Sequence, residues 1–274
     1  MKRQIIQRVA RIAAIKPFVA FGLYGIDTGQ AGASQQVVQP NAYPCKTVVS
    51  ETNNAFDGIL TSNETPSGAK AYINDYFPAI CDGSGGIPGN SSAWVMITDD
   101  SRPYTAPGCT LAQSGWLSTS SNSYGGTPYY AAPFYEYGNT SVCNLPVQVP
   151  NAATLTPGGT HEYQVYDTVI NRTPCTAFYV DTVLMACKNT GGWTANSAQF
   201  LAERHHSNDQ IPGDTGTEEK FYSVESDISG AWYNEPANLP VNQSPGDGGF
   251  TPGPSNDPNK FFVWDPNCNP TCSY

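Results

Sequence analysis

Two short segments of this sequence contain side chains that could do chemistry together. The first, residues 111–115, contains Gln113, and the second, residues 198–204, contains Glu203. A glutamate can accept a proton from water and return it, and a glutamine amide can donate a hydrogen bond to a developing negative charge. Together the two groups could hydrolyse an amide bond without a metal ion, a serine or a cysteine.

Both residues are expected on β-strands, where side chains alternate between two faces. Glu203 then shares a face with Leu201 and Gln199. Because burying a charged carboxylate beside apolar neighbours is costly, we expect Glu203 to have a raised pKa or a specific partner. Two simpler interpretations remain open: Gln113 as an exposed strand residue, and Glu203 as a surface residue paired with Arg204.

The rest of the chain predicts the elements that would position these residues. Strand-like stretches are short and bounded by Gly- and Pro-rich turns, and no segment before residue 230 has a helical period. Many strands without intervening helices are typical of an all-β protein, an antiparallel β-sandwich. The expected strands are residues 69–77, 92–97, 111–117, 129–137, 161–170, 176–186, 198–203 and 220–226.

We expect one domain, residues 34–235, between a signal peptide and a C-terminal extension. Basic residues in the first 16 positions precede an apolar stretch and the small residues Ala31-Gly32-Ala33. This order is typical of a secretory signal, residues 1–33, although an amphipathic or disordered arm would also fit. The extension, residues 236–274, is expected to pack on the domain, with residues 238–259 as a surface loop anchored by residues 261–264.

The charge balance excludes some partners. The chain has 13 basic and 23 acidic residues, a net charge of −10, and removal of the expected signal would make it more acidic. We therefore expect no nucleic-acid partner. No segment beyond the expected signal is long and apolar enough to span a membrane, so after processing we expect no membrane partner. With few cations to repel one another in acid, activity there is expected, although an acidic secreted protein without a pH preference fits equally.

The eight cysteines indicate disulfides in an exported chain. Cys175 and Cys187 flank a stretch expected to be one extended strand, which would hold them too far apart to bridge each other. No CxxC pair occurs with a matching histidine pair, so we expect no zinc site and no cofactor.

Four motifs occur in the order found in the glutamic peptidases called eqolisins. They are Ser92-Ala93-Trp94-Val95, Leu111-Ala112-Gln113-Ser114-Gly115, Phe134-Tyr135-Glu136-Tyr137 and Ala198-Gln199-Phe200-Leu201-Ala202-Glu203-Arg204. The turn Thr156-Pro157-Gly158-Gly159 also resembles that family, and the likeness spans roughly residues 50–230. The chain departs from the family pattern at Gln199, where a glutamate is usual, and at Thr98, where an aspartate is common.

The resemblance implies a fold, an activity and roles for residues. It implies two curved antiparallel sheets of the concanavalin A-like or jelly-roll type, with the site on a concave face. It implies a secreted, acid-active endopeptidase that needs no cofactor, takes polypeptide substrates and is expected to be a monomer. Gln113 and Glu203 match the catalytic pair, Trp94 an aromatic residue beside them, and Glu136 a cleft residue. Trp94, Glu136 and Tyr135 are expected to bind substrate.

Other patterns offer competing hypotheses. Asp-Thr-Gly occurs at residues 27–29 and 214–216, as in aspartic peptidases that use paired aspartates. Aromatic residues clustered in residues 129–137 would suit a glycan-binding module without catalytic activity. His205 and His206 are expected at the surface or at the rim of the site, since neighbours on a strand point apart and cannot easily share one metal ion. Asp99 and Asp100 are expected in a turn, with calcium binding a lesser alternative.

Overall fold

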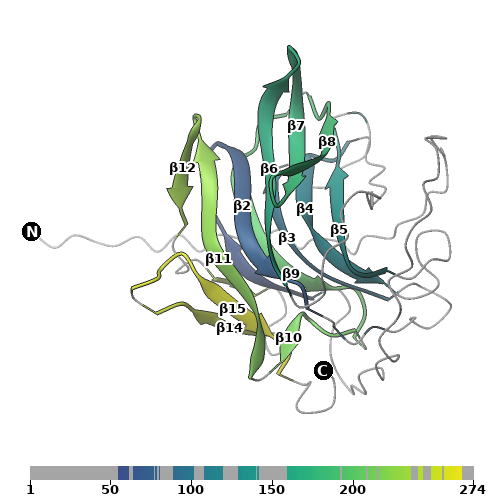
Figure 1. Ribbon diagram of the computed structural model, residues 1–274, viewed down its shortest axis with the longest axis vertical. Coiled ribbons are helices and arrows are strands. Elements are labelled where there is room, and N and C mark those ends of the chain that lie inside the picture. The colour runs from purple at the N-terminus through teal and green to yellow at the C-terminus, as the bar shows by residue number, and fades with distance from the viewer. Residues whose placement is uncertain are drawn as a thin grey trace, which may run out of the picture.

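The computed structural model describes most of the chain beyond residue 54. The described residues are 55–61, 64–76, 78, 80, 89–101, 108–119, 129–139, 141, 159–191, 193–207, 209–214, 216–235, 240–242, 248–254 and 256–266. The expected signal peptide and the first Asp-Thr-Gly triplet lie outside them. Over the described part of the chain the only regular elements are strands, arranged in two antiparallel sheets (Figure 1). The prediction of an all-β sandwich is confirmed.

Sheet A is six-stranded and carries both predicted chemical residues. Its order is β13-β1-β9-β3-β4-β5, and every neighbouring pair is antiparallel. The bounds are β13 Pro240–Asn242, β1 Ala55–Leu60, β9 Ser197–Arg204, β3 Asn90–Thr98, β4 Leu111–Thr119 and β5 Tyr129–Tyr137. β3, β4 and β5 thus follow one another along the chain, whereas β13, β1 and β9 come from distant parts of it.

Sheet B forms the second layer of the sandwich. Its main path is β14-β15-β11-β2-β6-β7-β8, and β10 and β12 each pair with β11. The bounds are β14 Gly249–Pro252, β15 Phe261–Trp264, β11 Thr217–Ile228, β2 Pro66–Asn74, β6 Thr160–Ile170, β7 Thr173–Val180, β8 Val183–Lys188, β10 Gly213–Asp214 and β12 Ala231–Asn234.

The main hydrophobic core lies between the two sheets. Alternate residues of sheet A, such as Val95, Trp116 and Phe200, pack with Phe178 and Phe221 of sheet B. A second, smaller apolar cluster lies on the other face of sheet A and contains Phe56, Trp94, Met96, Leu111, Leu117, Phe134 and Leu201. Strand alternation therefore gives sheet A two apolar faces, and only one of them faces sheet B.

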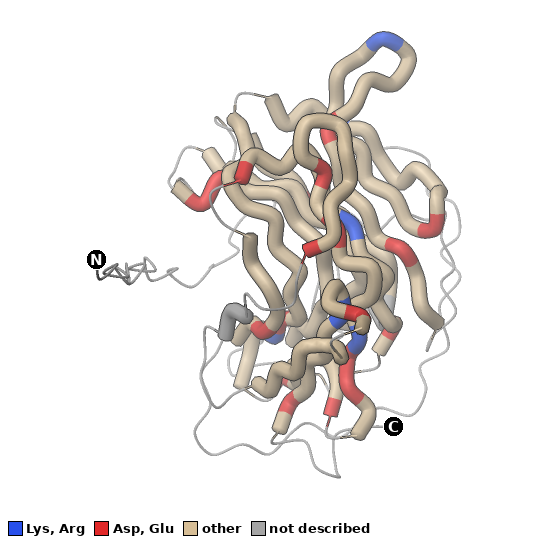
Figure 2. Tube along the Cα trace, turned by 90° about the vertical axis from the view of Figure 1, so that its left-hand side faces the viewer, with Lys and Arg blue, Asp and Glu red and all other residues tan. Residues whose placement is uncertain are grey.

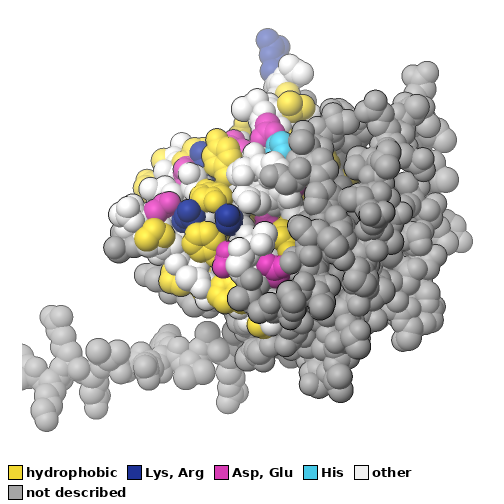
Figure 3. Space-filling model, turned by 60° about the horizontal axis from the view of Figure 1, so that its bottom comes forward, with side chains coloured by type: hydrophobic (Ala, Val, Ile, Leu, Met, Phe, Trp, Pro, Cys, Tyr) yellow, Lys and Arg dark blue, Asp and Glu magenta, His cyan; other side chains and the backbone are white. Residues whose placement is uncertain are grey.

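The outer face of sheet B is aromatic and carries lysines. Tyr166 stacks on Tyr179 at 5.7 Å between ring centroids. The ammonium group of Lys260 lies over the rings of Tyr222 and Phe262, 4.3 and 5.0 Å from their centroids. Figure 3 shows such a surface, with lysine or arginine side chains set among hydrophobic ones. Acidic positions are spread over the fold and basic ones are few (Figure 2).

The prediction of one strand over residues 176–186 is wrong, because the chain reverses at Asp181 and Thr182. Both residues have positive φ, 48° and 73°, as a two-residue hairpin turn requires. The hairpin brings Cys175 and Cys187 together in a disulfide, with 5.5 Å between their Cα atoms. The expectation that these cysteines need other partners is therefore also wrong.

The predicted loop over residues 238–259 is wrong for part of its length. β13 pairs with β1 at the edge of sheet A, and β14 pairs with β15 in sheet B. The Phe261 side chain is fully buried and stacks on Phe221 at 4.4 Å. The chain beyond residue 235 thus supplies strands to both sheets.

Thr182→Gly is expected to stabilise the protein by about 1 kcal/mol. A β-branched residue at positive φ is strained, and glycine adopts this conformation without strain. The free energy of unfolding in denaturant, with the disulfide intact, checks this. The matched control is Thr173→Gly in the exposed start of β7, where glycine is expected to destabilise. An equal loss of stability in both variants would contradict the strain at Thr182.

Candidate functional site

Strand register brings the predicted chemical residues onto one face of sheet A. Gln113 on β4 pairs with Met96 on β3 and with Glu136 on β5. Glu203 on β9 pairs with Ser92, which lies two residues from Trp94 on β3. Because side chains alternate along a strand, these residues all share the face that carries the smaller apolar cluster.

Glu203 receives one hydrogen bond on each carboxylate oxygen. The Trp94 indole Nε1–H donates to Oε2 at 2.8 Å, and His205 Nε2 lies 2.8 Å from Oε1. The Glu203 side chain is only 14% exposed. A carboxylate held by two donors among apolar neighbours has a defined orientation, as a proton acceptor requires.

Gln113 is held by the second carboxyl group of the face. Its Nε2–H donates to Glu136 Oε2 at 2.5 Å. Burial and the negative charge of Glu203 raise the pKa of Glu136 to about 8, although His205 and the bond from Gln113 act in the opposite direction. The charge of Glu203 thus acts on Glu136. The two halves of the candidate site are offset along the sheet, because Glu203 pairs with Ser92 and Gln113 pairs with Met96, four residues further along β3. Near neutral pH, Glu136 is largely protonated.

The position opposite Trp94, residue 115, has no room for a side chain. The two residues pair directly between β4 and β3. A Cβ atom on Gly115 would lie 2.1 Å from the Ala93 carbonyl oxygen and 2.7 Å from the Cα and Cβ of Trp94. The absence of a side chain at residue 115 therefore lets Trp94 lie where its indole reaches Glu203.

Gly115→Ala is expected to destabilise the fold by about 1 to 3 kcal/mol and to displace the Trp94 indole. Thermal unfolding measures the first effect and the near-ultraviolet circular dichroism of tryptophan the second. Gly191→Ala is the matched control, because a Cβ there meets only the side chain of Asn189. A Gly115→Ala variant as stable as this control would contradict the steric argument.

A further amide–carboxylate pair lies on the same face. Gln199 Nε2–H donates to Asp100 Oδ1 at 3.0 Å, and Gln199 pairs with Met96 in the β9–β3 ladder. Burial raises the pKa of Asp100 above its ordinary value, although bonds from Ser197 and Gln199 oppose the shift. The two departures from the family pattern noted in the sequence thus lie beside one another, and Asp100 supplies a carboxylate two residues beyond Thr98.

Two expectations about site residues are corrected by the alternation of side chains. Tyr135, expected to bind substrate, lies on the opposite face from Glu136, is buried in the main core and packs on Phe178 at 5.0 Å between ring centroids. Arg204 does not pair with Glu203. Its buried guanidinium lies 3.5 Å from Asp265, on the other side of the sheet.

Other expected residues are placed away from this face or outside the described chain. Tyr137 packs against the main core, and the side chains of Tyr129 and Tyr130 lie outside the described residues. Asp214 begins the second Asp-Thr-Gly triplet and pairs with Thr217 between β10 and β11. Among the described residues, no cluster of three or more His, Cys, Asp or Glu side chains could hold a metal ion.

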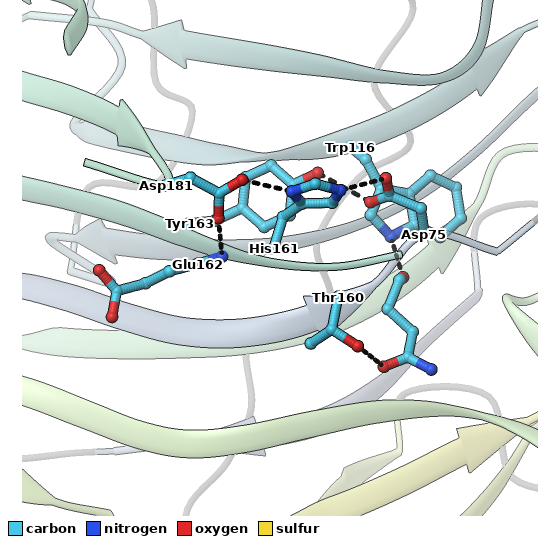
Figure 4. Close-up of polar contacts among 8 residues, drawn as sticks. Asp75, Trp116, Thr160, His161, Glu162, Tyr163 and Asp181 are labelled. Atoms are coloured by element: carbon cyan, nitrogen blue, oxygen red, sulfur yellow. Dashed lines mark hydrogen bonds and ion pairs between the residues drawn. The ribbon is translucent and has the colours of Figure 1, made fainter. Parts of the chain in front are cut away.

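A second polar cluster links β2, β6 and the β7–β8 turn. His161 lies between two carboxylates, with Nε2 3.3 Å from Asp75 and Nδ1 against Asp181 (Figure 4). The Tyr163 hydroxyl donates to Asp75 at 2.9 Å. Burial raises the pKa of Asp75 to about 7, although the charge of His161 and the bond from Tyr163 oppose the shift. We assign no chemistry to this cluster.

The comparisons with known proteins indicate a distant likeness in fold. No family model and no curated protein matches this sequence. The structure is similar to two solved structures of scytalido-glutamic peptidase, each bound to a transition-state analogue. The TM-scores are 0.49 and 0.48 at 12% and 11% sequence identity, covering 79% of this chain and 100% of the other. A likeness this distant carries no statement about activity.

No helix in the described part of the chain is long and apolar enough to cross a membrane.

Proposed function

We propose that this protein is a peptidase of the glutamic type that hydrolyses polypeptides with Glu203, Gln113 and a water molecule. One observation carries the proposal. Two glutamates on one face of sheet A have different environments: Glu203 accepts two hydrogen bonds, and Glu136 has a pKa raised to about 8. Such pairs, with different tasks for each carboxyl group, are typical of acid–base catalysis.

In the proposed reaction, Glu203 takes a proton from water as the water oxygen forms a bond to the scissile carbonyl carbon. The carbonyl oxygen becomes negatively charged and accepts a hydrogen bond from Gln113. A primary amide has two N–H donors, so one can hold Glu136 while the other serves the oxyanion. When the carbon–nitrogen bond breaks, Glu203 returns its proton to the departing amine. The products are one carboxyl group and one amine.

Glu136 has an orienting role in this proposal. Its bond at 2.5 Å from Nε2 fixes which end of the Gln113 amide faces the substrate. Because its pKa is raised, it stays uncharged in acid and in neutral solution and does not repel the carboxylate of Glu203. Trp94 and Glu136 are therefore proposed to act at the site through Glu203 and Gln113, and to contact a bound peptide.

We further propose export and activity in acid. The Cys175–Cys187 disulfide supports an oxidising compartment. The excess of acidic over basic residues supports compactness at low pH, because few positive charges remain unbalanced there.

Digestion of a denatured protein substrate in acid tests the activity. We expect cleavage that is insensitive to pepstatin and to a metal chelator, and a loss of rate on the order of 10² to 10³ in Gln113→Ala. Inhibition by pepstatin would favour paired aspartates instead. A chain that cleaves no protein but binds sugars on a glycan array would favour the glycan-binding alternative.

A further inference from the structure

His205 contacts Glu203 because of its place in the chain. It follows β9 directly, two residues after Glu203, so the two side chains leave the same face of the extended backbone. Its backbone N–H donates to the Asn90 carbonyl at 3.0 Å, which continues the pairing of β9 with β3 past the end of the strand. The imidazole is thus carried by a backbone that the sheet holds in register.

With this contact, both carboxylate oxygens of Glu203, the proposed proton acceptor, have a hydrogen-bond partner. His205 Nε2 lies 2.8 Å from Glu203 Oε1, and Trp94 Nε1 lies 2.8 Å from Oε2. We propose that His205 is a positioning residue which, together with Trp94, holds the Glu203 carboxylate in the orientation that takes a proton from the attacking water. One donor lies on β3 and the other directly after β9, so the carboxylate cannot rotate about its last bond without breaking one of the two bonds.

The charges around His205 favour its protonated form. Burial alone would lower the pKa of His205, but the charge and hydrogen bond of Glu203 and the charge of Asp209 outweigh it and raise the pKa above its ordinary value. Asp209 is itself fixed, because its carboxylate accepts the backbone N–H groups of Asn90 at 3.0 Å and His206 at 3.1 Å. With its side chain 37% exposed, His205 can exchange its proton with solvent.

The protonated ring donates from both nitrogens, so it cannot turn an acceptor toward the carboxylate. Loss of this proton allows a tautomer in which Nε2 is an acceptor that faces Glu203. Activity is therefore expected to fall on the alkaline side of its pH profile as His205 titrates. The kinetic part of this inference rests on the proposed peptidase function, and the contact itself can be tested without it.

Two substitutions of His205 separate the effect of its hydrogen-bond donor from the effect of its charge. His205→Gln keeps a neutral donor, so we expect most of kcat to remain while the alkaline limb due to His205 disappears from the pH profile. His205→Phe removes the donor. We then expect kcat to fall about 10- to 100-fold with little change in KM, because a small misplacement of a catalytic group reduces the rate by this order. The matched control, His206→Gln, is expected to leave the alkaline limb in place.

The outcomes distinguish failure of this inference from failure of the proposed function. Cleavage by the natural chain with an undiminished kcat in His205→Phe would overturn the positioning role alone. No cleavage by the natural chain under any condition would overturn the peptidase proposal and the positioning role together.

Titration of the His205 ring by nuclear magnetic resonance tests the contact without activity. In the full-length protein its pKa is expected above the ordinary histidine value, and Glu203→Gln is expected to lower it. Glu162→Gln, on β6 of sheet B, serves as the control and is expected to leave it unchanged. A His205 pKa that does not respond to Glu203→Gln would overturn the inference.

Discussion

Glu203→Gln is expected to reduce the peptidase kcat by about 10³-fold, because an amide cannot take the proton of the attacking water. Glutamine has nearly the same shape, so the fold and the substrate KM should change little. Single-turnover cleavage of a denatured substrate in acid measures the loss. Circular dichroism and the thermal midpoint verify that the variant is folded.

Glu136, the other glutamate on this face of sheet A, provides the clearest comparison with Glu203. Glu136→Gln replaces a carboxyl group that is already largely uncharged in acid, so it is expected to retain far more activity than Glu203→Gln. Glu162→Gln, on the other sheet, should retain all of it. Equal losses in Glu136→Gln and Glu203→Gln would mean that the proton acceptor is not assigned by the environments of the two carboxyl groups. Full activity in Glu203→Gln would reject the proposed mechanism.

The free energy of unfolding is expected to fall as pH rises from about 4 to about 7, which is unusual because acid destabilises many proteins. Asp75 is the main source. Its pKa is about 7 in the folded protein and has an ordinary value of 3.8, so the folded state binds more protons in this window. The stability that proton binding by Asp75 adds to the folded state is fully present below pH 3.8. It is lost as the pH rises through about 7. A shift of this size corresponds to a loss on the order of 4 kcal/mol.

Other buried carboxyl groups act in the same direction. Burial and the charge of Asp75 raise the pKa of the fully buried Glu219 well above its ordinary value. Glu136 contributes likewise through its raised pKa. A protein that holds neutral carboxyl groups in its interior is therefore expected to be most stable where the proposed enzyme would work, in acid.

Asp75→Asn tests this second prediction. The amide can still accept the Tyr163 hydroxyl and carries no charge at any pH, so the slope of unfolding free energy between pH 4 and pH 7 is expected to flatten. Denaturant unfolding at a series of pH values measures it. Asp257→Asn, near the surface, is the control and should leave the slope intact. A slope unchanged by Asp75→Asn would show that Asp75 is ionised in the folded protein throughout this range.

Much of sheet A could be predicted from the sequence, because its strands are bounded by clear turn residues and keep a period of two. The predicted segment over residues 111–117 became β4, and 198–203 became β9, each within two residues of its observed bounds. The arrangement around Glu203 required knowing that β9 pairs with β3, and local sequence does not encode the pairing of strands so far apart in the chain. Gln113 and Glu136 lie on the consecutive strands β4 and β5, so their contact depended on the register of that pair.

The errors have particular physical causes. Asp181 and Thr182 form a tight turn without the glycine or asparagine that usually indicates one, so the sequence pattern does not predict the hairpin or its disulfide. The motif that contains Glu136 does not place Tyr135 at the site, because adjacent strand residues point to opposite faces. The bond of His205 to Glu203 depends on how the chain leaves β9, which no motif specifies.

The edge strand β13 has a consequence for how the molecule is made. β1, the first strand described, is flanked in sheet A by β9 and β13, both from the second half of the chain. During synthesis β1 must therefore wait, unpaired, until β9 and then β13 have left the ribosome. The nascent chain carries an exposed strand edge during that time, so it has to be kept from aggregating until both partners are made.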